Sequence, residues 1–195
     1  MIAMAKRQEF KPDKPRSGVL SKLFLTQLQR RALLKWGLYG LLLLALSIVQ
    51  DVLLCRVRLF GATTELVPVG IFLICLAEGA ETGSVFSLAA ACLYLFSGTA
   101  AGYYSIVFIT ALSIAVTLFR QSYLQKGFAA AMLCTAFAVL VYEMAVFFIG
   151  VFLEMTTWGR ISSHFLTGVY SLAFAPVLYP IVHGISTIAG VTDVT

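Results

Sequence analysis

The chain has 195 residues, of which 60% are hydrophobic and 12% are charged, and its mean hydropathy is +0.93. A soluble domain of this length has too small an interior to bury so much apolar surface, so the composition excludes a water-soluble globular protein and indicates a membrane protein. The net charge of +5 is concentrated in a basic N-terminal segment, which favours an acidic membrane surface as its partner, and no basic patch interleaved with aromatic residues indicates nucleic-acid binding.

The first 35 residues are predicted to form a basic cytoplasmic tail. They carry nine Lys and Arg and two acids, a net charge of +7. From Val19 to Lys35, apolar residues recur on one face of a helix while basic residues lie elsewhere. Two interpretations stay open: an amphipathic helix on the cytoplasmic membrane surface, or a leader that orients the first span. Both place the segment in the cytoplasm, next to membrane lipids.

The first two hydrophobic helices are predicted at about 36–54 and 66–80. The first has an uncharged centre, with Asp51 near its outer end, and the spans that follow favour an uncleaved anchor over a signal peptide. The second contains Pro68 in its first turn, where proline costs little helix stability. Because this second helix is short for a span, a re-entrant segment stays an alternative.

The uncharged stretch 82–119 is predicted to form two helices joined by a tight turn. One straight helix of this length would measure roughly 57 Å, about twice the hydrocarbon core of a bilayer. Turn chemistry is confined to 97–102, where two glycines can adopt positive φ angles. We therefore expect helices at about 83–96 and 103–119.

Small and polar residues mark both of these helices as packing surfaces. Gly83, Ser87 and Ala91 recur at four-residue spacing on the first, and Ser113 and Thr117 form a similar pair on the second. In a bilayer, small side chains let helix backbones approach closely. We expect these residues to pack within the chain, and a partner interface is the alternative.

The last two helices are predicted at about 127–153 and 161–186. Pro176 and Pro180 are expected to be able to bend the second of them. Six spans would place both termini on the same side of the membrane. Eleven Lys and Arg fall in the tail and the 120–126 loop and three fall on the other side, so the positive-inside bias places both termini in the cytoplasm.

The predicted fold class is therefore all-α, a polytopic membrane helix bundle over residues 36–189. We expect about six transmembrane helices, or five if the second does not cross. Residues 190–195 form a short cytoplasmic C-terminus.

Glu143 is the most informative single residue, because it lies well inside an apolar helix. A carboxylate at that depth usually faces the bundle and finds a donor, or stays protonated. Three interpretations stay open: a structural polar clamp between helices, a proton or substrate relay, and a contact with a partner. A relay needs a second buried titratable group, for which Asp51 is the candidate.

No catalytic, cofactor-binding or metal site is predicted. The four cysteines lack C-x-x-C spacing, and His164 and His183 lie toward opposite ends of one helix. Ser97 lies in a predicted turn with His164 on the same side, so an intramembrane protease must be considered, but the G-x-S-x-G elbow of a serine nucleophile is missing. A Walker-type phosphate loop is also missing. We therefore expect no enzyme.

Five short motifs are spread along the predicted helices. In chain order they are Ser47-Ile48-Val49-Gln50-Asp51, Leu66-Val67-Pro68, the block from Gly83 through Tyr94 to Gly102-Tyr103-Tyr104, Tyr142-Glu143 and Phe174-Ala175-Pro176. Together they resemble the MreD family of bacterial rod-shape-determining membrane proteins. The resemblance covers about 41–184. The family often has an Asp after the third helix, whereas Leu95 and Phe96 follow Tyr94 here, so no role of that acid is expected.

The resemblance implies a non-catalytic scaffold of the cell-elongation complex in the bacterial inner membrane. Family members bind the bitopic protein MreC and, with it, connect cytoplasmic MreB filaments to peptidoglycan synthases outside. Their fold is similar to the six-helix substrate-binding subunits of energy-coupling-factor vitamin transporters, which supplies the alternative of a small-molecule-binding transporter subunit. Such a subunit needs a roomy outward cavity lined by polar groups, and the sequence offers few of these, so the scaffold is the favoured expectation.

Overall fold

The computed structural model describes residues 27–56, 61–98, 100–123 and 127–188, and these residues form helices, turns and loops but no β-strand. The described residues include two short 3-10 helices, labelled η2 and η3. The helices are α1 (Gln27–Val52), η2 (Leu54–Arg56), α2 (Leu66–Glu78), α3 (Ala80–Phe96), α4 (Tyr104–Tyr123), α5 (Phe128–Phe152), η3 (Trp158–Arg160), α6 (Ile161–Ala173) and α7 (Ala175–Ile188).

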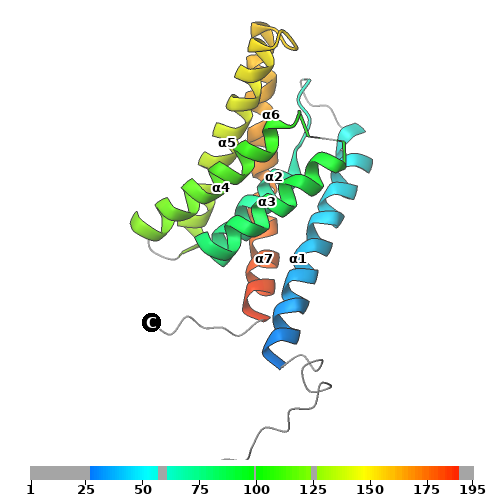
Figure 1. Cartoon of the computed structure of the whole chain (residues 1–195). Helices are drawn as coiled ribbons and strands as arrows, with labels where there is room; N and C mark the ends of the chain where they lie inside the picture. Colours follow the sequence, from blue (N-terminus) through cyan, green and yellow to red (C-terminus); the bar gives the residue numbers. More distant parts are fainter. Residues whose placement is uncertain (1–26, 57–60, 99, 124–126, 189–195) are drawn as a thin grey trace, which may run out of the picture.

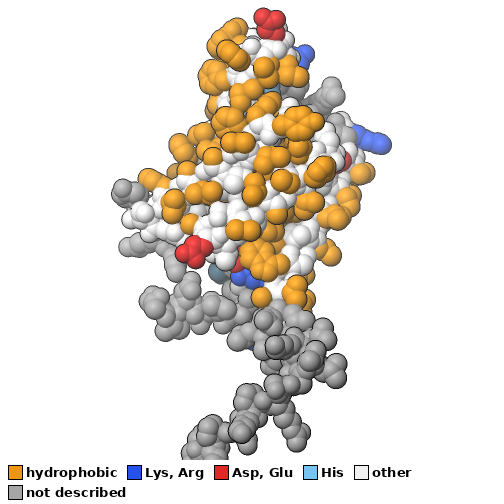
Figure 2. All heavy atoms as spheres, in the orientation of Figure 1, with side chains coloured by type: hydrophobic (Ala, Val, Ile, Leu, Met, Phe, Trp, Pro, Cys, Tyr) orange, Lys and Arg blue, Asp and Glu red, His pale blue; other side chains and the backbone are white. Residues whose placement is uncertain are grey.

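The chain runs back and forth through one bundle, and α3 and α4 lie obliquely to α1 and α5 (Figure 1). Gln27 and Ile188 lie at the same end, which we call the inner end; the other end, with the turn after α3, is the outer end. Hydrophobic side chains cover most of the face seen in Figure 2, and charged side chains gather toward its two ends. This distribution fits a bundle whose middle faces lipid and whose two ends face water.

By length and composition, three helices can cross a membrane, namely α1, α4 and α5, and the bent pair α6–α7 makes a fourth if it counts as one span. The helices α2 and α3 are apolar but shorter. The prediction of an all-helical membrane bundle is confirmed at this level. Six spans, and the likeness to transporter subunits, stay predictions.

The helix α1 begins at Gln27, nine residues before the boundary expected at Trp36. Residues 27–35 therefore continue directly into the first span, while the beginning of the expected amphipathic segment, 19–26, lies outside the described residues. Trp36 packs against Phe86 of α3, with ring centroids 5.4 Å apart. The basic residues at this end of α1 thus belong to the same continuous helix as the first span.

The last predicted helix is two helices, α6 and α7, bent by 48°. The break at Phe174 comes two residues before Pro176, which lacks an N–H group and whose ring crowds the preceding turn. The second proline, Pro180, lies inside α7. Because of the bend, α6 packs along α5, whereas α7 makes most of its contacts with α1 and α2.

The helix α2 occupies the centre of the bundle and contacts every other α-helix (Figure 1). All residues from Leu66 to Leu76 are buried, 11 of the 13 in the helix. At 1.5 Å per residue it is roughly 20 Å long, shorter than the roughly 30 Å hydrocarbon core. A helix enclosed in this way needs protein partners for the buried backbone groups near its ends that no hydrogen bond within the helix satisfies.

Other helices supply those partners. Gln50 of α1 accepts hydrogen bonds through its Oε1 from the N–H groups of Leu66 (2.8 Å) and Val67 (3.1 Å). Pro68 follows and has no N–H to satisfy. At the opposite end of α2, Nη1 of Arg120 on α4 donates to the carbonyl of Leu76 over 2.7 Å.

The small-residue stripe on α3 lies inside the bundle, against α2. A methyl group added at Gly83 would lie 2.8 Å from Sγ of Cys75 and 2.9 Å from its carbonyl oxygen. Ser87 and Ala91 are also buried. On α4, Thr117 donates to the carbonyl of Ser113 (2.7 Å), and its hydroxyl also lies 3.5 Å from Sγ of Cys75. The stripe therefore packs within the chain.

Replacing Gly83 by Ala should lower the free energy of unfolding by about 1–3 kcal/mol, because the added methyl group overpacks the α2–α3 contact. Gly40→Ala is the matched control, since nothing lies within 4 Å of the methyl position at this helical glycine. Reversible unfolding in mixed micelles measures both. Equal stability of the two variants would contradict this packing.

Gln50→Met should destabilise the bundle by about 1–3 kcal/mol, because two enclosed N–H groups at the start of α2 lose their acceptor. Gln121→Met, on the exposed part of α4, serves as the control and should change stability little. The same unfolding assay compares them. A neutral Gln50→Met would mean that α2 does not depend on this cap.

Candidate functional site

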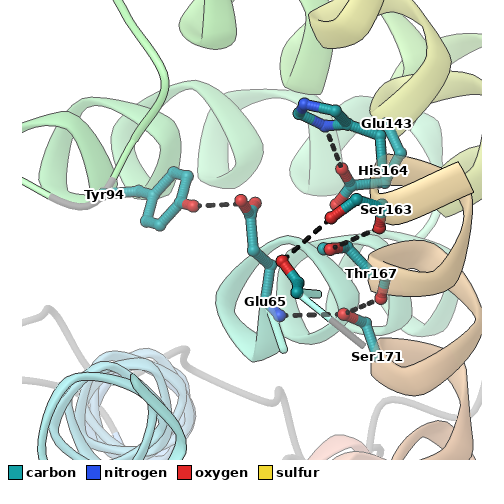
Figure 3. A network of polar contacts seen from close by, with 8 residues as sticks. Glu65, Tyr94, Glu143, Ser163, His164, Thr167 and Ser171 are labelled. Carbon is teal, nitrogen blue, oxygen red and sulfur yellow. Dashed lines mark hydrogen bonds and ion pairs between the residues drawn. The ribbon is translucent and has the colours of Figure 1, made fainter. Parts of the chain in front are cut away.

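Polar side chains from four parts of the chain meet inside the bundle toward its outer end (Figure 3). Glu65 precedes α2, Tyr94 lies on α3, Glu143 on α5 and His164 on α6. We call these four residues the outer polar cluster. Their meeting depends on the fold, because 99 residues separate Glu65 from His164 along the chain.

Glu65 is held through both its side chain and its backbone. The hydroxyl of Tyr94 donates to Oε2 of Glu65 over 3.0 Å, and the N–H of Glu65 donates to Oγ of Ser171 on α6 over 2.8 Å. Glu65 lies outside the candidate spans, and burial raises its pKa to about 8, with the charge of Glu143 adding to the increase. Near neutral pH this carboxyl group therefore keeps its proton.

Glu143 lies inside the bundle with an exposed fraction of only 2%. Its Oε2 is 3.8 Å from Nδ1 of His164, whereas its Oε1 has no hydrogen-bond partner among the described residues. Gly168 of α6 makes room for this side chain, because a methyl group there would lie 3.4 Å from Cγ of Glu143. The acid is thus directed toward α6 and away from the lipid side.

A row of hydroxyl groups on α6 borders the cluster (Figure 3). Ser163 donates to the carbonyl of Gly61 (2.9 Å), Thr167 to the carbonyl of Ser163 (3.1 Å), and Ser171 to that of Thr167 (2.7 Å). Ser163 and Ser171 thereby tie the segment before α2 to α6. This segment, which is described from Gly61 onward, positions Glu65.

The other candidate residues lie elsewhere. Asp51 accepts a hydrogen bond from Ser47 on its own helix (3.5 Å). Ser97 donates to the carbonyl of Tyr94 (2.7 Å) at an exposed turn. The titratable group that lies beside Glu143 is His164, and a relay that also uses Asp51 stays a prediction.

Three members of the cluster were not singled out by the sequence as site residues: Glu65, Tyr94 and His164. Glu65 sits in a segment predicted to be an outer loop, and its only signal is its place before a proline-containing first turn. Tyr94 contributed to a motif but carries no charge. His164 was considered only with Ser97, because periodicity does not reveal which helices will be neighbours.

The chemistry available to the cluster is proton exchange and hydrogen bonding. It combines two carboxyl groups, an imidazole and a phenol, without a nucleophile activated by a base. Within the ranges that the structure describes, no three His, Cys, Asp or Glu side chains converge as metal ligands. A closed polar clamp is the simplest role for these contacts.

The Tyr94–Glu65 hydrogen bond should give a measurable coupling energy in a double-mutant cycle of Tyr94→Phe and Glu65→Met. At pH 6 the protonated carboxyl group should give about 0.5–1.5 kcal/mol, and at pH 9 the ionised acceptor should raise the coupling to about 1.5–3 kcal/mol. Reversible unfolding at the two pH values measures it. Tyr103→Phe, at an 84% exposed position, is the control. Coupling that falls with rising pH would contradict this description.

Comparisons with known proteins gave no match. No family model matches the chain, and neither a curated protein nor a solved structure does. What the chain does must therefore be inferred from the residues and contacts described above.

Proposed function

We propose that the chain is a non-catalytic membrane scaffold that works as MreD-like proteins do, binding a single-span MreC-like partner and helping to connect cytoplasmic MreB filaments to peptidoglycan synthesis outside. Its location would be the bacterial inner membrane, with both termini in the cytoplasm. The observation that carries the proposal is that three of the five short motifs resembling this family meet at the start of α2.

Each motif contributes to a buried contact. Gln50 of the first motif accepts hydrogen bonds from Leu66 and Val67 of the second. Tyr94, from the third, donates to Glu65, the residue just before the second motif. Glu143 pairs with α6, and the motif at Phe174 coincides with the bend between α6 and α7. Motifs far apart in the chain thus meet in one architecture, which supports a shared fold.

The filled centre of the bundle supports a scaffold over a substrate carrier. A subunit that captures its substrate from outside needs a cavity among the outer halves of its helices. Here the middle of the bundle is occupied by α2, whose residues Leu66–Leu76 are all buried. Close contacts such as that of Gly83 with Cys75 leave no space between α2 and α3.

The exposed face of α1 is our candidate for the partner contact. Only 17% of the α1 span is buried in the bundle, compared with 44% of the α5 span. Leu41, Leu44 and Ile48 are 67%, 62% and 53% exposed and recur at helical spacing along this face. A single transmembrane helix packs well along such a stripe.

The experiment is co-purification of the full chain with an MreC-like protein from the same membrane in mild detergent. A photo-crosslinking residue at Leu44 should capture the partner, whereas one at Phe137 on α5, which is 63% exposed, should capture mainly lipid. Capture from Phe137 alone would move the contact to α5. Absence of the partner from the purified complex, together with normal cell shape after deletion, would overturn the proposal.

A small-molecule-binding transporter subunit is the second candidate. The unpartnered Oε1 of Glu143, enclosed in the outer polar cluster, favours it, because a ligand donor would satisfy this atom. Native mass spectrometry of the detergent-purified chain separates the two candidates. A retained small molecule that Glu143→Gln releases would favour the transporter subunit, and a ligand-free protein in complex with an MreC-like partner would favour the scaffold.

A further inference from the structure

The bend between α6 and α7 leaves a cavity at the inner end of the bundle. Since α7 bends by 48° from α6, the helix that packs along α5, α7 makes little contact with α5 there. The cavity between them has a volume of about 530 Å³ and is completed by the ends of α2 and α4. This volume lies in the range of small-ligand sites, roughly 300–1,000 Å³. The cavity is distinct from the outer polar cluster and belongs to the opposite end of the bundle.

The lining of this cavity is amphipathic. Leu73, Ala131 and Val182 contribute apolar surface, and the polar lining includes Arg120 and His183. The ring of His183 stacks on that of Tyr179, another lining residue, at 5.8 Å and 5° between planes. An occupant must therefore combine a polar group with an apolar part.

The charges around the cavity favour an anion. The negative charge of Glu78 is already compensated, because its carboxylate pairs with Lys35 and accepts a hydrogen bond from Tyr39 over 2.6 Å. Arg120 donates to the Leu76 carbonyl, and no carboxylate forms a salt bridge with it in the described part of the chain. A guanidinium has five N–H donors in a planar fork, so further donors of Arg120 are available to an anionic group.

We propose that this cavity binds a phosphate-bearing anionic lipid, with its phosphate at Arg120 and part of an acyl chain against Ala77 and Tyr179. Basic pockets between transmembrane helices on the cytoplasmic side are suited to such headgroups. The inner end carries the start of α1 and the end of α7, and the positive-inside bias predicts that it faces the cytoplasm. The site does not depend on the scaffold function, so either can fail without the other.

The test uses the full chain, purified and stripped of lipid in detergent, and then titrated with phosphatidylglycerol. Native mass spectrometry counts bound lipid, and the shift in unfolding temperature gives an independent affinity. Phosphatidylcholine, oleate and glycerol phosphate form the comparison arms. We expect phosphatidylglycerol to bind about tenfold or more tightly than phosphatidylcholine, because only its headgroup carries a net negative charge.

Two variants alter the site in different ways. Arg120→Gln should weaken binding of phosphatidylglycerol about tenfold or more by removing the charged donor. Ala77→Leu should weaken it by filling the apolar part of the cavity from an exposed lining position, and it keeps the test open if Arg120→Gln fails to fold. Arg160→Gln, at the exposed end of η3 and outside the cavity lining, is the matched control and should bind as the unaltered chain does.

Each remaining outcome would overturn the proposal. Equal affinity for phosphatidylglycerol and phosphatidylcholine, or unchanged binding by both site variants, would leave Arg120 a solvated or purely structural cation. Glycerol phosphate binding as tightly as the lipid would identify a soluble phosphate compound as the occupant. Oleate binding equally well would show that the site does not select phosphate.

Discussion

The structure depends on satisfying the backbone at the two ends of α2. A short helix enclosed by other helices has no water to hydrogen-bond its first N–H groups and last carbonyls, and each unsatisfied group costs free energy. Here the N–H groups of Leu66 and Val67 bind Gln50, and the Leu76 carbonyl binds Arg120. The position of each of these neighbours along the axis of α2 is therefore fixed, because each must place one particular side chain at one particular end of α2.

The helix α1 illustrates this constraint, since it holds α2 at both ends. Tyr39 binds Glu78 at the inner end of α2, and Gln50 binds Leu66 at its outer end. Eleven residues of α1 separate Tyr39 from Gln50, a rise of roughly 17 Å, and twelve residues of α2 separate Leu66 from Glu78, roughly 18 Å. The two antiparallel helices thus match in length between their contacts, and sliding one along the other would break both.

The positions of most helices could be predicted, because hydrophobic runs and turn residues mark them in the sequence. The turn after residue 96 and the bend near Pro176 both follow from local chemistry. The outer polar cluster was not predictable, because Glu65 and His164 meet only after α2 and α6 are packed. The continuity of α1 from Gln27 into the first span was also missed, because the change from charged to apolar residues suggested a boundary between 35 and 36. Tertiary contacts of Lys35 and Trp36 stabilise the helix across that point.

The direction of α2 gives the two ends of the bundle opposite chemistry. The N-terminus of a helix presents N–H donors and partial positive charge, so it requires acceptors, and the outer end accordingly holds Gln50 and Ser171. The C-terminus presents carbonyls and partial negative charge, so it requires donors, and the inner end holds Arg120. A donor-rich inner end agrees with the orientation that the basic tail predicts. Reversing α2 in the membrane would place its cationic partners on the side where positive residues are disfavoured. The capping of α2 and the positive-inside bias of the whole chain therefore favour the same orientation in the membrane.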